Sequence, residues 1–352
     1  MRVIALYGPK DLREEEWPKP EPGAGEVRVK IKSVCICGSD TTQYITGGIG
    51  GFKTPVPFVL GHETAGLIDA VGSGVENLFE GTPVAIEPDI PCMECEFCLT
   101  GRQNICPNVK FLGTPPVQGA LAEFIVIPAK NALPVKASVT FAEIACIEPL
   151  AIGIYTATKM NITCGETVAV FGAGGVGISC AIAAKKAGAR VIAITDKVRS
   201  RLEIAEKFGT ENIININEQN VEEKILELTD GRGVDVAIEA AGELPALHDA
   251  IAAAAIGGRV AIIGIPHETE WSFSTSAARR KELLIQNIRR SNHSTQTAVD
   301  WVERGEIKLV GLVSHNLPWE KAEEAYNKAA AQEEGTLRIS LEPEEIDEPF
   351  YP

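Results

Sequence analysis

Residues 166–196 read ETVAVFGAGGVGISCAIAAKKAGARVIAITD, and this stretch decides the fold of the second half of the chain. Residues 166–173 form an apolar run typical of a buried strand, residues 176–188 read as a helix that ends at a glycine, and residues 190–196 read as a second strand. The same alternation of strand and helix continues to about residue 265, with a helix expected at about 247–255 and a strand from residue 259. The sequence therefore predicts an α/β domain built on a doubly wound parallel sheet.

The turn between the first strand and the helix reads G-x-G-x-x-G over residues 172–177. Glycines there permit a tight turn and let the backbone approach a pyrophosphate, whose charge then lies at the helix N-terminus. Asp196 ends the next strand, where a carboxylate can accept both hydroxyls of an adenosine ribose and repels a 2′-phosphate. We therefore expect NAD as the cofactor; NADP stays an alternative because Lys197, Arg199 and Arg201 follow closely. The predicted cofactor-binding residues are Gly172, Gly174, Gly175, Val176, Gly177, Asp196 and Arg201.

The composition is that of a globular chain with more than one domain. Of its 352 residues 45% are hydrophobic and 23% are charged, and one domain commonly holds about 150 residues. The net charge of −15 and the lack of a basic stretch argue against nucleic acid as a partner. The longest uncharged stretch, residues 168–184, is short for a membrane span and broken by glycines, and the first residues do not read as a signal peptide. We therefore expect a cytoplasmic protein with no membrane partner.

Four cysteines, Cys92, Cys95, Cys98 and Cys106, have the spacing C-x2-C-x2-C-x7-C. Gaps of two residues let a tight loop turn successive thiolates toward one tetrahedral ion, and the fourth cysteine closes the shell. A disulfide pair is the weaker alternative, because three cysteines so close in sequence cannot all bridge one another. The spacing predicts a structural zinc site, which leaves no open position for a substrate.

The chain before residue 150 has a different character. Short alternating runs, such as residues 26–34 and 122–128, are typical of antiparallel strands joined by turns. After about residue 290 the sequence predicts two helices, at 295–306 and 319–331, with short strands between them that return to this first domain.

Three motifs in this part offer a second group of metal ligands: CGSD at 37–40, GHETAG at 61–66 and EPL at 148–150. Cys37 and His62 are ligands that suit zinc, and Glu63 and Glu148 supply carboxylate oxygens. From the residues alone, an ordinary core or surface pair of histidine and glutamate is the alternative. A predicted nicotinamide site in the same chain favours the metal, because a Lewis acid beside a hydride acceptor suits the oxidation of an alcohol.

These motifs occur in an order that resembles the zinc-dependent medium-chain dehydrogenases, and within them the sorbitol (polyol) dehydrogenases. The resemblance covers nearly the whole chain, and it includes V109-KFLGTPPVQG119 and E148-PLA151 as well as the cysteine lobe. It implies a GroES-like, mostly-β catalytic domain over residues 1–150 and 290–352, with a structural zinc lobe at about 88–107. It also implies a Rossmann dinucleotide-binding domain over residues 151–289.

The resemblance implies a role for each candidate residue. A catalytic zinc is held by Cys37, His62 and Glu63 with a water, while Glu148 binds that water or coordinates in its place. Asp40 fixes the ring of His62, and Ser39 accepts the proton of the substrate hydroxyl, so that the implied catalytic residues are Ser39, His62 and Glu148. The implied substrate-binding residues are Ser39, Phe111, Glu148, Arg289 and Asn292.

The activity implied is transfer of a hydride from a secondary hydroxyl of a polyol, such as sorbitol or xylitol, to NAD, which gives a ketose. L-Threonine 3-dehydrogenase and butanediol or secondary alcohol dehydrogenase remain alternatives, as does a non-enzymatic member that has lost its metal. The expected assembly is a homo-tetramer or homo-dimer. The sequence departs from the family pattern after the CGSD motif, where Thr42 replaces a histidine of many members and Gln43 replaces the expected tyrosine.

Overall fold

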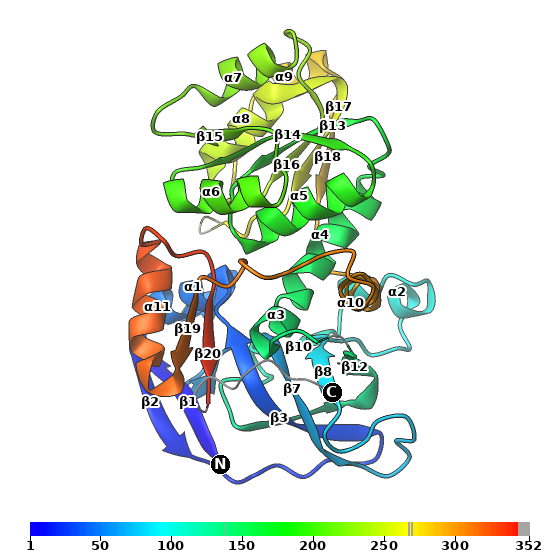
Figure 1. The fold of residues 1–352 in the computed structure, drawn as a ribbon, viewed down its shortest axis with the longest axis vertical. Helices are drawn as coiled ribbons and strands as arrows, with labels where there is room; N and C mark the ends of the chain where they lie inside the picture. Colours follow the sequence, from blue (N-terminus) through cyan, green and yellow to red (C-terminus); the bar gives the residue numbers. More distant parts are fainter. Residues whose placement is uncertain (137, 267, 269, 344–352) are drawn as a thin grey trace. The chain divides into compact units, whose positions relative to one another are not determined.

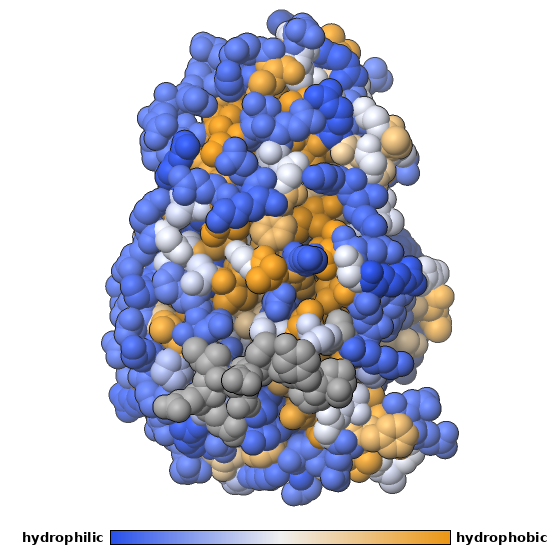
Figure 2. Space-filling model, in the orientation of Figure 1, coloured by the Kyte–Doolittle hydropathy of each residue, from blue (hydrophilic) through white to orange (hydrophobic). Residues whose placement is uncertain are grey.

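The computed structural model describes residues 1–136, 138–266, 268 and 270–343, and it divides into two compact units (Figure 1). The first unit comprises residues 1–148 together with the chain from residue 295 onward, and the second comprises residues 149–294. The last part of the range expected for the first domain, residues 344–352, lies outside the described residues. The face drawn in Figure 2 is mostly hydrophilic with apolar areas between the polar ones, in keeping with a globular chain.

The second unit is built on a six-stranded sheet in the order β15-β14-β13-β16-β17-β18. Every pairing in this sheet is parallel. The strand before the glycine-rich turn, β13, lies near the middle, with β14 and β15 on one side of it and β16, β17 and β18 on the other. The predicted doubly wound sheet is therefore confirmed. The strands are β13 (Thr167–Phe171), β14 (Arg190–Asp196), β15 (Ile213–Asn215), β16 (Val234–Glu239), β17 (Ala254–Ile262) and β18 (Leu284–Asn287).

Five helices connect these strands, and α5 and α6 lie in front of the sheet in Figure 1. Right-handed crossovers from β13 to β14 and on to β15 place these two helices on the same face. Helix α5 begins after Gly174 and buries a run of alanine and isoleucine residues against β13 and β14. The helices are α5 (Gly175–Lys186), α6 (Arg199–Lys207), α7 (Val221–Leu228), α8 (Leu244–Ala253) and α9 (Thr275–Arg280).

One boundary in this unit differs from the sequence prediction. A helix was expected over residues 247–255 and a strand from residue 259, but α8 ends at Ala253 and β17 starts directly at Ala254. Ala254 pairs with Val234 of β16 and is buried. Alanine favours helices, so the sheet contact overrides the local preference here.

The first unit is mostly β, as predicted. A seven-stranded sheet follows the order β12-β8-β7-β3-β20-β19, with β11 paired to the other part of β3, and a three-stranded sheet has the order β2-β1-β6. The strands of these two sheets are β1 (Arg2–Gly8), β2 (Asp11–Glu16), β3 (Glu26–Cys35), β6 (Phe58–Val59), β7 (Glu63–Val71), β8 (Pro83–Ile86), β11 (Phe124–Pro128), β12 (Ala132–Pro134), β19 (His315–Pro318) and β20 (Ile339–Glu342).

The remaining elements of the first unit are short pairs of strands and a few helices. The strand pairs are β4 (Gly48–Ile49) with β5 (Phe52–Lys53), and β9 (Asp89–Ile90) with β10 (Lys110–Phe111). The helices are α1 (Gly38–Thr46), α2 (Glu96–Leu99), α3 (Phe141–Ala145), α10 (Thr295–Glu303) and α11 (Ala322–Ala331). Strand β20 pairs with the end of β3, so the C-terminal part of the chain returns to this sheet, as the sequence predicts.

Helix α4 (Ile147–Lys159) starts in the first unit and continues in the second. Together with α3 it forms a helical stretch, Phe141–Lys159, that is apolar and long enough to cross a membrane by length and composition alone. Of its most apolar window 72% is buried inside the protein, and a core helix passes the same test. The sequence reading did not single out this helix.

Asp235 joins two central strands of the second unit and gives a prediction about stability. Its carboxylate accepts hydrogen bonds from the backbone N–H and the hydroxyl of Thr167, at 2.9 and 2.8 Å, and it pairs with Arg232. Burial alone would raise the pKa of Asp235, but these partners outweigh it and lower the pKa from 3.8 to about 2. The carboxylate therefore stabilises the fold above about pH 4, and this stability is lost as the pH falls toward 2.

We expect Asp235→Asn to lower the free energy of unfolding by about 1 to 2 kcal/mol at neutral pH, allowing for the partly exposed side chain. Urea unfolding at several pH values measures this difference. The gap between the two proteins should narrow as the pH falls below about 4 and close at about pH 2, where the carboxylate of the unmodified folded protein takes up a proton. Equal stability of both proteins at pH 7 would contradict the assignment.

Candidate functional site

Cys37, His62 and Glu63 come together in the first unit. One ligand atom of each lies within 4.8 Å of the ligand atoms of the other two. Cys37 caps the N-terminus of α1, and Glu63 begins β7, where it stands opposite Cys35 of β3. The fold thus brings the end of β3, the start of α1 and the start of β7 to one point. Two of the three predicted motifs, CGSD and GHETAG, thus place their candidate ligand atoms together, and their binding of a metal stays a prediction.

Asp40 fixes the orientation of His62. Its Oδ1 lies 3.3 Å from Nδ1 of His62, and its Oδ2 accepts the backbone N–H of Cys37 at 3.1 Å. The Oδ1 atom also accepts the backbone N–H of Gly61, at 3.3 Å. With Nδ1 facing this fully buried carboxylate, Nε2 is the ring nitrogen that can bind a metal, an arrangement common around metal-binding histidines.

Cys37 and His62 each stabilise the charged form of the other. Burial raises the pKa of the Cys37 thiol, but the neighbouring His62 outweighs this effect, and the pKa is about 7. Burial lowers the pKa of His62, but Asp40 and Cys37 outweigh it and hold that pKa well above its ordinary value. A thiolate is thus readily formed here, and the thiolate is the form of cysteine that binds metals.

Glu63 is fully buried and forms an ion pair with Arg338, which is itself 4% exposed. Arg338 lies just before β20, the strand that pairs with β3 beside Glu63. The arginine compensates a carboxylate that would otherwise be costly to bury. The sequence reading missed Arg338, and no local pattern around it points to a site.

Glu148 lies in the first turn of α4 and is buried. Burial raises its pKa to about 8, against the lowering effect of the nearby His62. Among the described residues, the group of ligand atoms within 4.8 Å of one another does not include Glu148. Among the described residues, the Oε2 atom of Glu148 also has no hydrogen-bond partner. Glu148 therefore lies close enough to act on His62 electrostatically, and its predicted role as a ligand stays a prediction.

These residues fit a zinc ion. Thiolate sulfur, imidazole nitrogen and carboxylate oxygen are the three donor types that zinc takes from proteins. A set of three protein ligands leaves the fourth position open, as catalytic zinc sites require.

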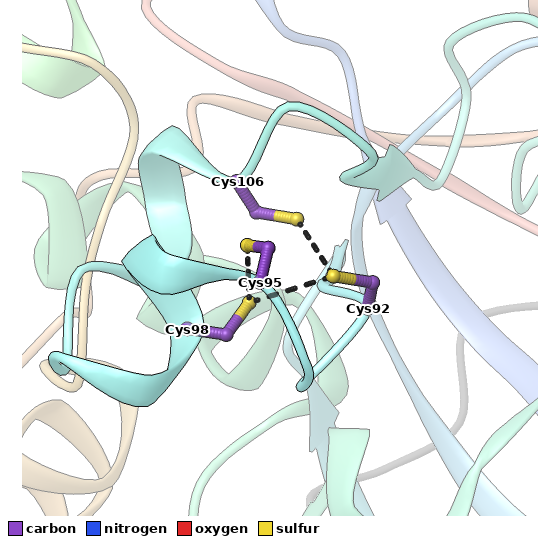
Figure 3. A group of neighbouring side chains, drawn as sticks. All are labelled: Cys92, Cys95, Cys98 and Cys106. Carbon is purple, nitrogen blue, oxygen red and sulfur yellow. Dashed lines mark hydrogen bonds between the residues drawn. The ribbon is translucent and has the colours of Figure 1, made fainter.

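The four cysteines of the predicted lobe converge on one point, with α2 among the segments that carry them (Figure 3). The sulfur atoms of Cys95 and Cys98 lie 3.5 Å apart, those of Cys92 and Cys106 lie 3.5 Å apart, and those of Cys92 and Cys98 lie 3.9 Å apart. A tetrahedron of thiolates at zinc–sulfur distances of about 2.3 Å has edges of about 3.8 Å. The spacing fits such a shell and is far too long for a disulfide.

The glycine-rich turn of the second unit has the geometry that a dinucleotide site needs. Gly172 has φ +113°, and a Cβ there would lie 2.8 Å from the backbone nitrogen of Ala241. A Cβ on Gly177 would lie 1.9 Å from the carbonyl oxygen of Gly172, so this close contact between turn and helix requires glycine. A Cβ on Gly174 would meet nothing within 4 Å, which leaves room beside the N-terminus of α5.

Asp196 stands at the end of β14, directly beside this turn. Its Oδ2 accepts the backbone N–H of Ala173 at 2.8 Å, and its Oδ1 accepts that of Val198 at 2.9 Å. The fold therefore brings Asp196 together with the predicted residues Gly172, Gly174, Gly175, Val176 and Gly177. Arg201 lies on α6, and its contact with a cofactor stays a prediction.

Glu239 is a buried acid that the sequence reading missed. It ends β16, next to β13, and its Oε1 accepts the backbone N–H groups of Ala241 and Gly242 at 2.8 and 2.7 Å. Burial raises its pKa, against the lowering effect of these donors. The carboxylate thus fixes the loop of residues 240–242, and the backbone of Gly172 packs against this loop. An acid directly after the apolar run of residues 236–238, at the end of a predicted strand, was the signal that could have found it.

The other predicted residues are distributed over both units. The ring of Phe111 contacts that of His62, with centroids 5.1 Å apart. Ser39 lies in the first turn of α1, next to Asp40. Arg289 and Asn292 belong to the second unit, in the segment after β18 where Arg290 and His293 have positive φ. Their roles toward a substrate stay predictions.

The fold and the ligand set together define a zinc-dependent dehydrogenase of the medium-chain class. Residues 23–137 match the alcohol dehydrogenase GroES-like domain, and residues 175–304 match the zinc-binding dehydrogenase domain. Sorbitol dehydrogenase of Bacillus subtilis is 37% identical over 343 residues, which cover 97% of each chain. Human sorbitol dehydrogenase is 36% identical over 325 residues, which cover 92% of this chain and 91% of the human one.

The chain therefore belongs to the zinc-binding alcohol dehydrogenase family, and it is similar to the sorbitol dehydrogenases over nearly its whole length. Among solved structures, an Escherichia coli enzyme described as a short chain alcohol dehydrogenase, in complex with NADH, superposes with a TM-score of 0.88 at 30% identity. The match covers 97% of this chain and 99% of that one. The predicted family, its oxidoreductase class and the pairing of a GroES-like with a Rossmann fold are confirmed.

Proposed function

We propose that this protein oxidises a secondary hydroxyl of a polyol of the sorbitol or xylitol type with NAD and yields a ketose. The observation that carries the proposal is the convergence of Cys37, His62 and Glu63, with Glu148 buried close by. The similarity to sorbitol dehydrogenases over 97% of the chain supports the choice of a polyol.

In this proposal Cys37, His62 and Glu63 hold a catalytic zinc, which supplies Lewis-acid chemistry that lowers the pKa of an alcohol. Ser39 accepts the proton of the substrate hydroxyl. Glu148 either completes the ligand set or holds a water beside it; its pKa of about 8 lets it carry a proton near neutral pH. Phe111 borders the substrate, and Arg289 and Asn292 bind its far hydroxyls.

The two units take separate tasks in the same proposal. The first unit, residues 1–148 with the chain from residue 295 onward, forms the catalytic domain, and its cysteine lobe holds a second, structural zinc. The second unit, residues 149–294, binds NAD through the glycine-rich turn, Asp196 and Arg201. The protein works in the cytoplasm as a homo-tetramer or homo-dimer.

The test is oxidation of a panel of substrates with NAD, followed by NADH absorbance. Sorbitol, xylitol and arabitol should be oxidised with higher kcat/KM than short primary alcohols. L-Threonine and 2,3-butanediol belong in the panel, because dehydrogenases of these substrates were the alternatives left open by the sequence. A much higher kcat/KM for L-threonine than for every polyol would move the assignment to an amino-acid dehydrogenase.

Cofactor choice gives a prediction centred on Asp196. Because a carboxylate at this place accepts ribose hydroxyls and repels a 2′-phosphate, kcat/KM with NAD should exceed that with NADP by about tenfold or more. Asp196→Ser should shrink this ratio and leave kcat with saturating NAD largely in place. Equal efficiency with the two cofactors in the unmodified protein would instead implicate Lys197, Arg199 or Arg201 in binding a phosphate.

A second prediction concerns Glu148. We expect Glu148→Gln to lower kcat about 100-fold or more, the usual loss when a proton-transferring group beside the reaction centre is removed. The affinity for NADH, measured by fluorescence titration, should change little, because the proposed partners of Glu148 are the metal-bound water and the substrate. Glu143→Gln on α3 is the matched control, since that carboxylate caps its own helix by accepting the backbone N–H of Thr140, and it should retain activity. Unchanged kcat in the Glu148 variant would remove it from the catalytic set.

A further inference from the structure

Gln43 lies on the inward face of α1, one helical turn beyond Asp40. It is 1% exposed, although glutamine is usually a surface residue. Residues three apart on a helix share a face, so Gln43 faces the same side of the protein as the carboxylate that orients His62.

The amide of Gln43 makes two hydrogen bonds to separate segments. Its Nε2 donates to the carbonyl oxygen of Gly113 at 3.1 Å, and its Oε1 accepts from the hydroxyl of Thr54 at 3.1 Å. Thr54 is also buried and follows the β4–β5 hairpin. One side chain therefore joins α1 to this hairpin and to the turn at residue 113.

The turn at residue 113 rests on the backbone next to His62. It is closed by a hydrogen bond from the backbone N–H of Thr114 to the carbonyl of Phe111, at 3.1 Å, and Gly113 has φ +71°. A Cβ at Gly113 would lie 2.8 Å from the carbonyl oxygen of Gly61, so the turn could not lie this close with any other residue.

Phe111 begins this turn and places its ring beside His62, at a centroid distance of 5.1 Å and an angle of 57°. The position of the ring depends on the turn that carries it. The turn is held on one side by the Gly61 backbone and on the other by the amide of Gln43.

We propose that Gln43 is a positioning residue that sets substrate specificity, because its amide holds the turn of residues 111–114 and thereby fixes Phe111 beside His62. The proposal rests on the proposed function, in which Phe111 borders the substrate. A small shift of the Phe111 ring changes the space available to a substrate, and it leaves the groups that take part in the reaction in place. A tyrosine, the residue expected here from the family pattern, offers one hydroxyl and not the separate donor and acceptor that the two segments require.

The test replaces Gln43 by methionine, which has nearly the same length and forms neither hydrogen bond. The matched control is Tyr44→Phe, which removes one side-chain hydrogen bond, to the exposed Asn327 at 3.1 Å, from the neighbouring residue of the same helix. For each protein, kcat/KM is measured with NAD for polyols of four, five and six carbons. Zinc content and NADH affinity are measured in parallel.

We expect the ratio of kcat/KM for six-carbon to four-carbon polyols to change at least about fivefold in Gln43→Met. In Tyr44→Phe the ratio should stay within about twofold of the unmodified protein, while zinc content and NADH affinity stay the same in both variants. A ratio in Gln43→Met that also stays within twofold overturns the proposal. Should Gln43→Met fail to fold, Gln43→Asn keeps the amide but is too short for both bonds, and the same ratio decides.

A readout without substrate separates this proposal from the proposed function. In protein labelled at histidine, the ring protons of His62 feel the ring current of Phe111, so their NMR resonances should shift in Gln43→Met and not in Tyr44→Phe. If the unmodified protein oxidises no polyol but these resonances shift, the proposed function fails and the positioning of Phe111 by Gln43 is supported. Unshifted resonances in Gln43→Met overturn the positioning role even where polyols are oxidised.

Discussion

Replacement of His62 by alanine is expected to reduce kcat/KM for every oxidised substrate by about a thousandfold or more. Loss of a Lewis acid removes several kcal/mol of stabilisation from the transition state, and about 1.4 kcal/mol corresponds to each factor of ten. By elemental analysis the variant should hold one zinc per chain, and the unmodified protein should hold two. The tetrathiolate shell does not involve His62, so its ion should remain.

The fold of the His62→Ala protein should persist, because Asp40 keeps its hydrogen bonds to the backbone N–H groups of Cys37 and Gly61. Circular dichroism and the thermal unfolding midpoint measure this. His248→Ala is a matched control: this histidine contacts the carbonyl of Ser272 in the second unit, and its loss should leave zinc content and turnover unchanged. Near-normal turnover by the His62 variant would remove the metal from the mechanism.

Cys95→Ser is expected to destabilise the protein while leaving the catalytic ligands in place. A structural zinc shell contributes about 10 kcal/mol or more of binding free energy in small zinc domains, so loss of one thiolate should cost several kcal/mol here. The measured results should be one zinc lost per chain and a clearly lower unfolding midpoint. Prolonged chelation of the unmodified protein should lower the midpoint in the same way.

Cys164→Ser provides the control for the Cys95 variant. Cys164 is exposed and lies in the second unit, outside both groups of metal ligands among the described residues. Its replacement should leave both zinc ions and the unfolding midpoint unchanged. Two zinc ions and an unchanged midpoint in Cys95→Ser would show that Cys95 is not a ligand of the structural zinc.

The sequence by itself determined the features that depend on residues close together in the chain. The alternation of β13, α5 and β14, the glycine-rich turn and the acid at the end of β14 all follow from local periodicity and backbone freedom, and the structure has them where they were predicted. The same holds for the cysteine lobe, because two-residue gaps bring thiols together within one loop.

Only the tertiary structure decided which residues that are distant in sequence come into contact. Arg338 reaches Glu63 because β20 pairs with β3 in the middle of the sheet, and nothing near Arg338 in the sequence announces this pairing. Ala254 joins a strand against its helical preference because a neighbouring strand offers it backbone partners.

Gln43 illustrates the same division most clearly. The sequence showed only that a glutamine stands where the family pattern expects a tyrosine. Its burial, and its bonds to Gly113 and Thr54, depend on three segments that meet only in the folded chain. Local patterns specify strands, turns and single-loop sites, whereas contacts across a sheet depend on register and packing, which no single stretch of sequence contains.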